Sequence, residues 1–395
     1  MNLPKTIFSF IVMLSSIQLS FSQSSTSNLP VVDLSKNYPL EKLRLQDFVT
    51  VEYVPLETTD DILLSEHANL SAVTDNYILV YESLFGDVYL FDRHTGKFCH
   101  HFNNKGQSGK EYSWIKVGVV LDEKNKEIFV CSQYFQVYDF DGNYKRTLKD
   151  INGFDHEMKV FDYNDECLLI FDDVVVEPGR EDKTTDKPYR LISKKDGSTV
   201  SKLNISFPKR VSNVVVQHMD NNMWRPYKFT YPYNAYYGKD FMIMDISSDT
   251  LYHLSPSNGL LKPVFTRTPS VFASEPRNIW TPYIATDKFM LFGTCIIDLN
   301  NGGGRFPTFM YDFNTRKLRN VLLLDMELNY GLIGAREWYI PHSNPSIGKN
   351  MVAELVPAPA MLEANKKKRL LGNGSEVARN LKDDDNQVVR ILKFK

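Results

Sequence analysis

The chain has 395 residues, 13% of them aromatic, and its 46 Lys and Arg against 48 Asp and Glu leave a formal charge of −2. This near balance excludes any general electrostatic attraction to nucleic acid or to an anionic membrane surface. The length exceeds that of an ordinary single-core domain, so several domains or a repeat architecture are expected.

The start of the chain is predicted to be a signal peptide. Lys5 precedes an apolar stretch over residues 7–19, and the small side chains of Ser20 and Ser22 suit cleavage after Ser22. The stretch is too short for a comfortable membrane span. No cysteine precedes Cys99, so a lipoprotein anchor at the cleavage site is ruled out. We expect a periplasmic or secreted protein that is not a lipoprotein and has no transmembrane segment.

A strand-turn-strand phrase returns at least five times along the middle of the chain. Its copies are VYLFDRHTGKF (88–98), VYDFDGNYKRT (137–147), YRLISKKDGST (189–199), LYHLSPSNGLL (251–261) and FMYDFNTRKLR (309–319). The equivalent points are taken as Asp92, Asp141, Ser193, Ser255 and Asp312, which lie 49 to 62 residues apart. Such an interval holds about four short strands with their turns, which is one blade of a β-propeller.

Both ends of the repeat region also show strand patterns. FVTVEYVPL (48–56) and QVVRILKFK (387–395) alternate between apolar and polar residues. The segment 357–371 lacks alternation and begins with two prolines and good helix formers, which predicts a short helix. The sequence therefore predicts an all-β, six-bladed β-propeller, closed by its N- and C-terminal strands, with a short helical insertion near the C-terminus.

Three regions follow from this reading: a signal peptide over 1–22, an N-terminal extension over 23–45 and the propeller over 46–395. The four cysteines are widely separated and lie beside strand-like residues: Cys99, Cys131, Cys167 and Cys295. Buried free thiols are favoured over two disulfides, because a large domain does not need such staples.

Four segments carry a resemblance to a known family. They are YVPLETTDDILL (53–64), VYLFDRHTGKF with NKGQSGKEY (104–112), SDTLYHL (248–254) and LKDDDNQVVRILKFK (381–395). With them the chain resembles a secreted six-bladed β-propeller family, related to NHL-repeat propellers, of Gram-negative gut-type bacteria. Two turns depart from the pattern: Ser108-Gly109-Lys110 replaces Gly-Pro-Gly, and Asn386-Gln387 replaces Asn-Pro. The resemblance implies export and a frequent lack of assigned enzymatic activity.

No metalloprotease helix, phosphate-binding loop, nucleophile elbow or paired CxxC sequence occurs. The candidate binding residues lie instead in three aromatic segments. These are MWRPYKFTYPYNAYYG (223–238) with Trp224 and Arg225, NIWTPY (278–283) with Trp280, and REWYIPHSNPS (336–346) with Trp338 and His342. Exposed rings of this kind stack on sugars and peptides. The same rings could equally pack between blades or hold an ordered loop on the last blade, and the sequence leaves both open.

The sequence thus predicts an exported, non-catalytic binding propeller that presents an aromatic loop face to a glycan, peptide or protein partner, without a cofactor. The alternative is a lactonase-type hydrolase that depends on a divalent metal, because related six-bladed propellers can hold a cation in the central channel. That chemistry needs calcium or zinc held by carboxylate, Asn or His ligands from several blades. Metal ligands that lie so far apart cannot be recognised from the sequence alone. Enzyme activity therefore stays open, and the binding function is favoured.

Overall fold

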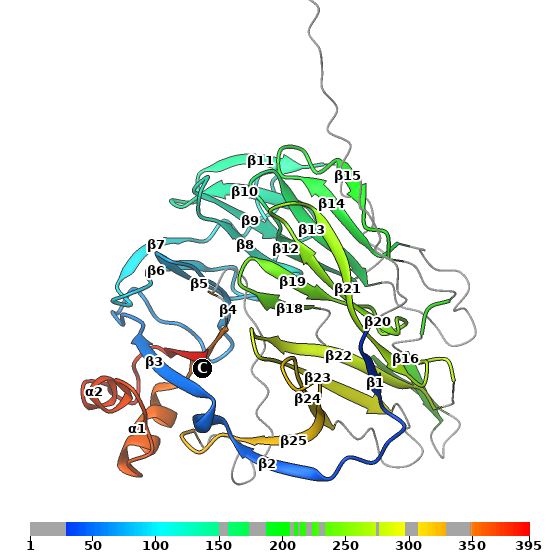
Figure 1. Cartoon of the computed structure of the whole chain (residues 1–395). Helices are drawn as coiled ribbons and strands as arrows, with labels where there is room; N and C mark the ends of the chain where they lie inside the picture. Colours follow the sequence, from blue (N-terminus) through cyan, green and yellow to red (C-terminus); the bar gives the residue numbers. More distant parts are fainter. Residues whose placement is uncertain are drawn as a thin grey trace, which may run out of the picture.

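The computed structural model describes residues 29–149, 157–173, 187–205, 209–211, 214–218, 223–228, 234–273, 276–296, 307–328, 348 and 350–395. In these residues six β-sheets are arranged in a ring, and each sheet forms one blade (Figure 1). The predicted all-β, six-bladed β-propeller is confirmed. We number the blades 1 to 6 in the order in which their innermost strands occur along the chain.

Blades 1, 2 and 3 are antiparallel sheets of four consecutive strands. Blade 1 contains β4 (Asn69–Val73), β5 (Tyr77–Tyr81), β6 (Val88–Asp92) and β7 (Phe98–Phe102). Blade 2 contains β8 (Gly118–Asp122), β9 (Glu127–Cys131), β10 (Phe135–Asp139) and β11 (Tyr144–Leu148). Blade 3 contains β12 (Glu157–Asp162), β13 (Cys167–Asp173), β14 (Tyr189–Ser193) and β15 (Thr199–Lys202). Because β8 contacts both β4 and β12, the first strand of each blade lies nearest the centre of the ring.

The middle strands carry continuous apolar runs because both of their faces are covered. Every residue of β9 is buried, and so are the three central residues of β5. A sheet with one wet face would alternate apolar and polar residues, whereas a blade packs against a neighbour on each side. Leu79 of blade 1 and Val130 of blade 2, for example, belong to one apolar cluster.

Blades 4 and 5 each gain a fifth strand from the N-terminal extension. Blade 4 contains β18 (Asn234–Tyr237), β19 (Asp240–Ile243), β20 (Thr250–Ser255) and β21 (Leu260–Thr268), and β1 (Val31–Asp33) pairs with β21 in parallel. Blade 5 contains β22 (Asn278–Ala285), β23 (Phe289–Ile296), β24 (Thr308–Asp312) and β25 (Leu318–Leu324), and β2 (Leu40–Arg44) pairs with β25 in parallel (Figure 1). The extension therefore covers two outer edges that would otherwise expose unpaired backbone groups.

Strands from both ends of the chain close the ring in blade 6, as predicted. After η1 (Leu45–Asp47), β3 (Val49–Pro55) pairs antiparallel with β27 (Val388–Phe394), which pairs with β26 (Met351–Val356). The helices α1 (Ala358–Lys366) and α2 (Gly374–Arg379) connect β26 to β27, and α2 packs on β3 (Figure 1). The predicted helical insertion is confirmed in α1, and α2 is an additional helix.

Gly372 allows the helical insertion to approach β3. Its φ is +56°, and a Cβ atom at this position would lie 2.0 Å from the carbonyl oxygen of Val51. No other residue type could adopt this conformation at this distance without moving the strand.

A buried ion network locks blade 6 to the end of blade 5. Arg390 on β27 is fully buried, and its guanidinium lies 2.6 Å from Asp325, 2.7 Å from Glu327 and 3.1 Å from Glu354. The hydroxyl of Tyr53 on β3 donates to Glu327 at 3.0 Å. The contacts join both chain ends to the segment that follows β25.

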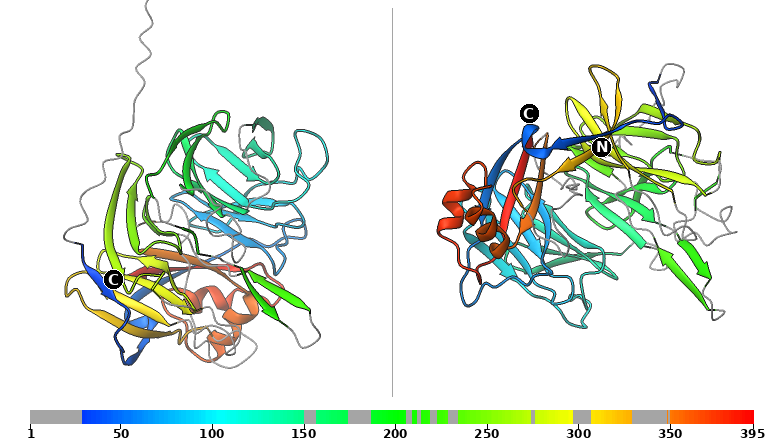
Figure 2. Two further views of the ribbon diagram at one scale, coloured as in Figure 1. Left: turned by 90° about the vertical axis from the view of Figure 1, so that its right-hand side faces the viewer. Right: turned by 90° about the horizontal axis from the view of Figure 1, so that it is seen from below.

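One hairpin lies outside the six sheets. It consists of β16 (Val214–His218) and β17 (Trp224–Lys228), which pair only with each other among the described strands and fall between blades 3 and 4 in the sequence. Both views in Figure 2 show this hairpin standing out from the ring. All four cysteines are free thiols, and three of them are buried, in agreement with the sequence prediction.

The equivalent point of the repeat in blade 2 is Asp139, and the choice of Asp141 was wrong. Asp92, Asp139 and Asp312 each end the third strand of a blade and accept hydrogen bonds from backbone N–H groups of the following turn. Asp141 lies inside that turn. The phrase VYDFDGN has two aspartates two positions apart, and sequence alone does not distinguish the strand end from the turn.

The strands of a blade alternate in direction, so its connections fall on two opposite faces of the ring. Turns from the first to the second strand and from the third to the fourth lie on one side, here called the turn face. Turns from the second to the third strand and links from one blade to the next lie on the other side, here called the loop face. Residues far apart in sequence therefore meet on each face.

Candidate functional site

A pocket of about 540 Å³ lies on the turn face between blades 1, 2, 3 and 4. Its wall is built mainly from the turns between the first and second strands of these blades. The charged residues of the wall are Asp75, Asp122, Glu123, Lys124, Asp162, Asp165, Glu166, Lys194, Lys239 and Asp240. Carboxylates outnumber lysines, so the wall carries a negative formal charge.

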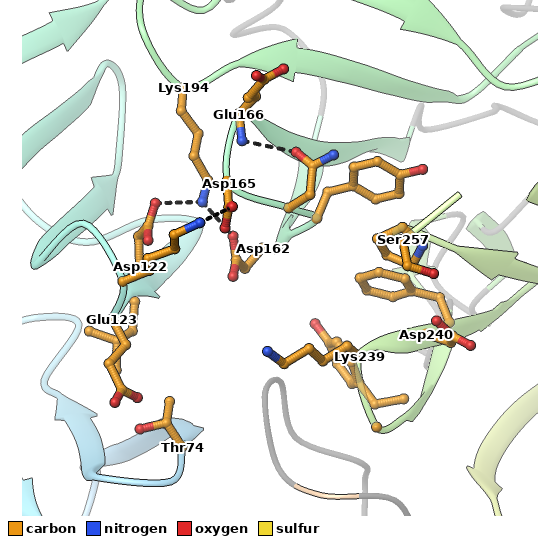
Figure 3. A pocket seen from close by; sticks show the side chains of 18 of the residues that line it. Thr74, Asp122, Glu123, Asp162, Asp165, Glu166, Lys194, Lys239, Asp240 and Ser257 are labelled. Carbon is orange, nitrogen blue, oxygen red and sulfur yellow. Dashed lines mark hydrogen bonds and ion pairs between the residues drawn. The ribbon is translucent and has the colours of Figure 1, made fainter. Parts of the chain in front are cut away.

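Lys194 is the buried centre of these charges. Its side chain is only 6% exposed, and Nζ lies 2.6 Å from Oδ2 of Asp122 and 2.7 Å from Oδ1 of Asp162 (Figure 3). Asp122 also accepts hydrogen bonds from the backbone and side-chain N–H groups of Asn125. Since Asp122 ends β8 and Asp162 ends β12, the triad ties blade 2 to blade 3.

Burial shifts the protonation equilibria of this triad. The loss of solvation raises the pKa of Asp162, against the lowering effect of Lys194. Burial alone would lower the pKa of Lys194, but the charge of Asp162 and the hydrogen bond to Asp122 outweigh it, so the pKa of Lys194 is raised. Lys194 therefore stays an ammonium group at neutral pH and is not prepared to act as a base or nucleophile.

Other charges of the wall are also paired. Lys124 forms an ion pair with Asp165, and Asp240 lies 2.9 Å from both the His253 ring and the Ser255 hydroxyl. Among the described residues, no group of three or more His, Cys, Asp or Glu side chains is placed to hold a metal ion. The lactonase-type alternative stays a prediction, and this pocket is suited to holding a polar ligand.

On the loop face, four large apolar side chains are exposed in blades 1 and 2. Leu84 is 64% exposed, Phe85 55%, Trp114 44% and Tyr134 51%. We call these four residues the aromatic patch. Leu84 and Phe85 lie in the turn from β5 to β6, Trp114 in the link from β7 to β8, and Tyr134 in the turn from β9 to β10.

Direct hydrogen bonds join the three connections that carry the aromatic patch. The N–H of Ile115 donates to the carbonyl of Ser83 at 3.0 Å. The Ser132 hydroxyl donates to the carbonyl of Trp114, and the Ser132 N–H donates to the carbonyl of Tyr134 at 3.1 Å. The three connections that carry the four side chains are therefore neighbours on the loop face.

Tyr112 fixes the link from below. Its side chain is 2% exposed, and its hydroxyl donates to the carbonyl of Gly86 at 2.7 Å and accepts from the N–H of Asn104 at 3.0 Å. Burial raises the pKa of Tyr112, which keeps the hydroxyl protonated. The backbone below the patch is thus held in place before any partner arrives.

Basic side chains border the patch. The exposed lysines of the link are Lys105, Lys110 and Lys116. Nζ of Lys105 donates to the carbonyl of Leu84 at 2.7 Å, and the Lys110 ammonium lies 5.6 Å from the centre of the Tyr144 ring. The acidic residue of the same link is Glu111, which accepts a hydrogen bond from the N–H of Ser108 at 2.8 Å. The link itself, with three lysines and one glutamate, therefore has a positive formal charge.

Trp280 is not a surface residue, and the expectation of an exposed ring there is corrected. It lies in β22, is fully buried, and donates its indole N–H to the carbonyl of Ser248 at 2.9 Å. Its ring packs against Phe265 and Phe292, with centroids 5.6 and 5.5 Å away. The segment NIWTPY is a strand, and its tryptophan serves packing between blades 4 and 5.

The other predicted site residues are not tested. Trp224 and Arg225 lie on β17, where the structure describes only the backbone. Trp338 and His342 lie outside the described residues. Their gathering on one face stays a prediction.

Sequence reasoning missed the aromatic patch, although a signal was present. Leu84 and Phe85 stand directly before Gly86-Asp87, a turn sequence, and Trp114 follows Ser113 in a link. A large apolar residue in a turn has no strand face on which to be buried, and this marks it as a candidate for the surface.

These features define a class of protein: a six-bladed β-propeller closed by both chain ends, with a charged pocket on one face and exposed aromatic residues on the other. The chain belongs to the DUF4934 family, a domain of unknown function that matches residues 29–393. No curated protein matches the sequence. The expected relation to NHL-repeat propellers stays a prediction.

Solved structures similar to this chain include a presumed exported protein of Bacteroides fragilis, with a TM-score of 0.56 and 14% identity over 90% of this chain and 99% of that chain. A functionally unknown protein of Desulfotomaculum acetoxidans has a TM-score of 0.32 and 11% identity over 65% and 83% of the two chains. A nidogen/laminin complex has a TM-score of 0.29 and 12% identity over 68% and 91%. The first likeness supports the fold. Among the described helices, none is long and apolar enough to cross a membrane.

Proposed function

We propose that this protein is an exported, non-catalytic binding propeller whose loop face holds a glycan, peptide or protein partner on the aromatic patch. The observation that carries the proposal is the joint exposure of four large apolar side chains on three connected loops. Such side chains gain free energy when they leave water. Trp and Tyr are also frequent among the residues that dominate binding energy.

The rigidity of the loops supports the same proposal. A loop that is already ordered loses little conformational entropy when a partner binds. The buried hydroxyl of Tyr112 and the bond from Ile115 to Ser83 supply this order. Trp114 is therefore presented in a fixed position.

Export is supported by two observations. The sequence begins with a pattern typical of a signal peptide that is cleaved after Ser22. The similar structure from Bacteroides fragilis is described as a presumed exported protein. A periplasmic or secreted location would place the loop face in contact with extracytoplasmic glycans and proteins.

Glycan and peptide arrays test the proposal with three forms of the protein. These are the wild type, Trp114→Ala and, as control, Leu40→Ala, because Leu40 is an exposed apolar residue on β2, outside the patch. Trp114→Ala should bind about tenfold or more weakly to the glycans or peptides that the wild type binds on the array, as truncation of a dominant contact does. Leu40→Ala should leave binding unchanged. Equal binding by all three forms would overturn the proposal.

A further inference from the structure

We infer that the occupant of the aromatic patch is an acidic peptide segment of a partner protein, with apolar side chains between its carboxylates. The inference rests on the proposed function and names the class of partner. It follows from two properties that the same surface combines: exposed hydrocarbon and a border of ammonium groups.

The border lysines are placed to meet carboxylates. Lys105 is held beside Leu84 by its bond to a neutral carbonyl, which leaves its charge uncompensated by that contact. An ammonium group has three N–H donors, and one carbonyl accepts only one of them. Lys116, also exposed, lies two positions after Trp114. An acidic segment crossing the patch would reach both ammonium groups.

The nearby carboxylates do not fully compensate these lysines. Asp87 lies 2.9 Å from both the His101 ring and the side-chain N–H of Asn103. Glu111 accepts from the N–H of Ser108 on its own link. These bonds hold both acids in place without removing their charges, so the acids offset the three lysines only in part and the border keeps an attraction for an anionic partner.

The apolar residues favour a peptide over a glycan. The side chains of Leu84 and Phe85 have no polar atoms, and these are the two most exposed residues of the patch. Sugar hydroxyls laid against them would lose water without gaining a hydrogen bond, which is costly. Leu, Ile or Phe side chains of a peptide would lose no such bond and would bury both surfaces.

The opposite face discriminates against the same partner. Carboxylates outnumber lysines around the pocket on the turn face. A negatively charged segment is therefore repelled there and attracted to the loop face, so the charge distribution of the ring selects its orientation.

Selection from a displayed library of random peptides tests the inference. The full chain is the bait, and enriched peptides are synthesised for affinity measurement. We expect Asp and Glu to be enriched together with Leu, Phe or Trp, and affinity to fall with rising salt. Lys116→Glu and Trp114→Ala should each weaken binding about tenfold. Lys239→Glu, on the turn face, is the matched control and should not. Thermal unfolding of each variant checks that it folds.

The outcomes separate this inference from the proposed function. Peptides that require Trp114 but have no acidic bias, or that ignore Lys116→Glu, would overturn the acidic class and leave the patch as a binding site. Peptides that ignore both substitutions would overturn both. If no peptide is enriched, the inference is overturned. An array glycan whose binding then depends on Trp114 would assign the patch to sugars.

Discussion

The side-chain amide of Asn373 hydrogen-bonds both backbone polar groups of Tyr53. The N–H of Tyr53 donates to Oδ1, and Nδ2 donates to the Tyr53 carbonyl, each at 2.8 Å. Tyr53 lies on β3, the outer strand of a blade in which the structure describes three strands. At this point one side chain makes the two bonds that a fourth strand would make, and so protects the open edge from pairing with another chain.

Replacing Asn373 by Ala should therefore destabilise the protein. The Tyr53 N–H and carbonyl would lose their partners in a partly buried place, which costs about 1–3 kcal/mol. Urea unfolding measures the loss. Asn380→Ala is the control, because Asn380 is exposed like Asn373 and, among the described residues, its side chain donates only to the Glu376 carbonyl, at 3.2 Å. Equal midpoints for the two variants would contradict the role of Asn373 at this edge.

Arg390→Met should be among the most damaging single substitutions. It leaves Asp325 and Glu327 buried without their cation, and removal of one partner from a buried ion network costs roughly 3–5 kcal/mol. Arg44→Met is the comparison, since Arg44 forms an exposed pair with Asp47 and should cost less than about 1 kcal/mol. Chemical unfolding at neutral pH would rank the two. A small effect at Arg390 would mean that the network does not lock the ring.

The same network predicts how stability depends on pH. Burial alone would raise the pKa of Asp325, but the charge and hydrogen bonds of Arg390 outweigh it and lower that pKa. A carboxyl with a lowered folded-state pKa stabilises the protein above its ordinary pKa of about 3.9, and loses this contribution as the pH falls through the lowered value. The wild type should therefore lose stability below about pH 4.

The stability of Arg390→Met should depend on pH in the opposite direction, at pH values above about 4. Without the guanidinium, burial dominates and raises the pKa of Asp325, so protonation of that carboxyl stabilises the folded state. Stability of the variant should rise as the pH falls from about 7 to about 5, where the wild type is flat. Unfolding midpoints across this range give the measurement, and parallel profiles for the two proteins would contradict the prediction.

The two aspartates that contact Lys194 should differ in importance. Asp122 is 4% exposed and also accepts two hydrogen bonds from Asn125, so Asp122→Asn should cost about 2–3 kcal/mol. Burial raises the pKa of Asp162, so its ionised form is already disfavoured. Asp162→Asn removes one of the two charges that face Lys194 but also relieves the desolvation of the Asp162 carboxylate, so it should cost less than Asp122→Asn. Urea unfolding of both variants would show the order, and a reversed order would contradict this account of the triad.

Two tryptophans should behave in opposite ways. Trp280→Ala removes a fully buried ring and should cost about 3–5 kcal/mol. Trp114→Ala removes an exposed ring and should change stability by less than about 1 kcal/mol, while it weakens partner binding. Thermal unfolding and array binding on the same samples separate the two effects. A stable Trp280→Ala protein would show that blades 4 and 5 do not depend on this ring.

The blades could be predicted from the sequence because each blade is local. Four strands and their turns lie within one repeat, and the alternating patterns at 48–56 and 387–395 marked the strands that close the ring. The two quoted family segments at these ends also meet in space: Asn386 bonds the carbonyls of Glu57 and Ile62 and the N–H of Leu64. These two family segments therefore contact each other where the two ends of the chain close the propeller.

The N-terminal strands, the pocket and the aromatic patch could not be predicted from the sequence, and the reason is physical. The strands β1 and β2 are short, and β2 is mostly exposed, so they carry little apolar pattern. Their position is set by partners far along the chain. The pocket and the aromatic patch consist of turn residues from several blades, and periodicity says nothing about which turns share a face. Trp280 shows the converse error, because an aromatic residue beside a proline can still be part of a buried strand.

The pairing of the N-terminal strands also has a kinetic consequence. Val31 pairs with Thr266, Leu40 with Asn320 and Val49 with Phe394, so β1, β2 and β3 pair with strands 235, 280 and 345 positions further along the chain. Contacts between such distant segments form slowly. Blades 1 to 3 form from neighbouring segments alone, and blades 4 and 5 add β1 and β2 from the N-terminal extension to four neighbouring strands. Only blade 6 must wait for β27. Closure of the ring therefore depends on the synthesis of β27, which is far from β3 in the chain.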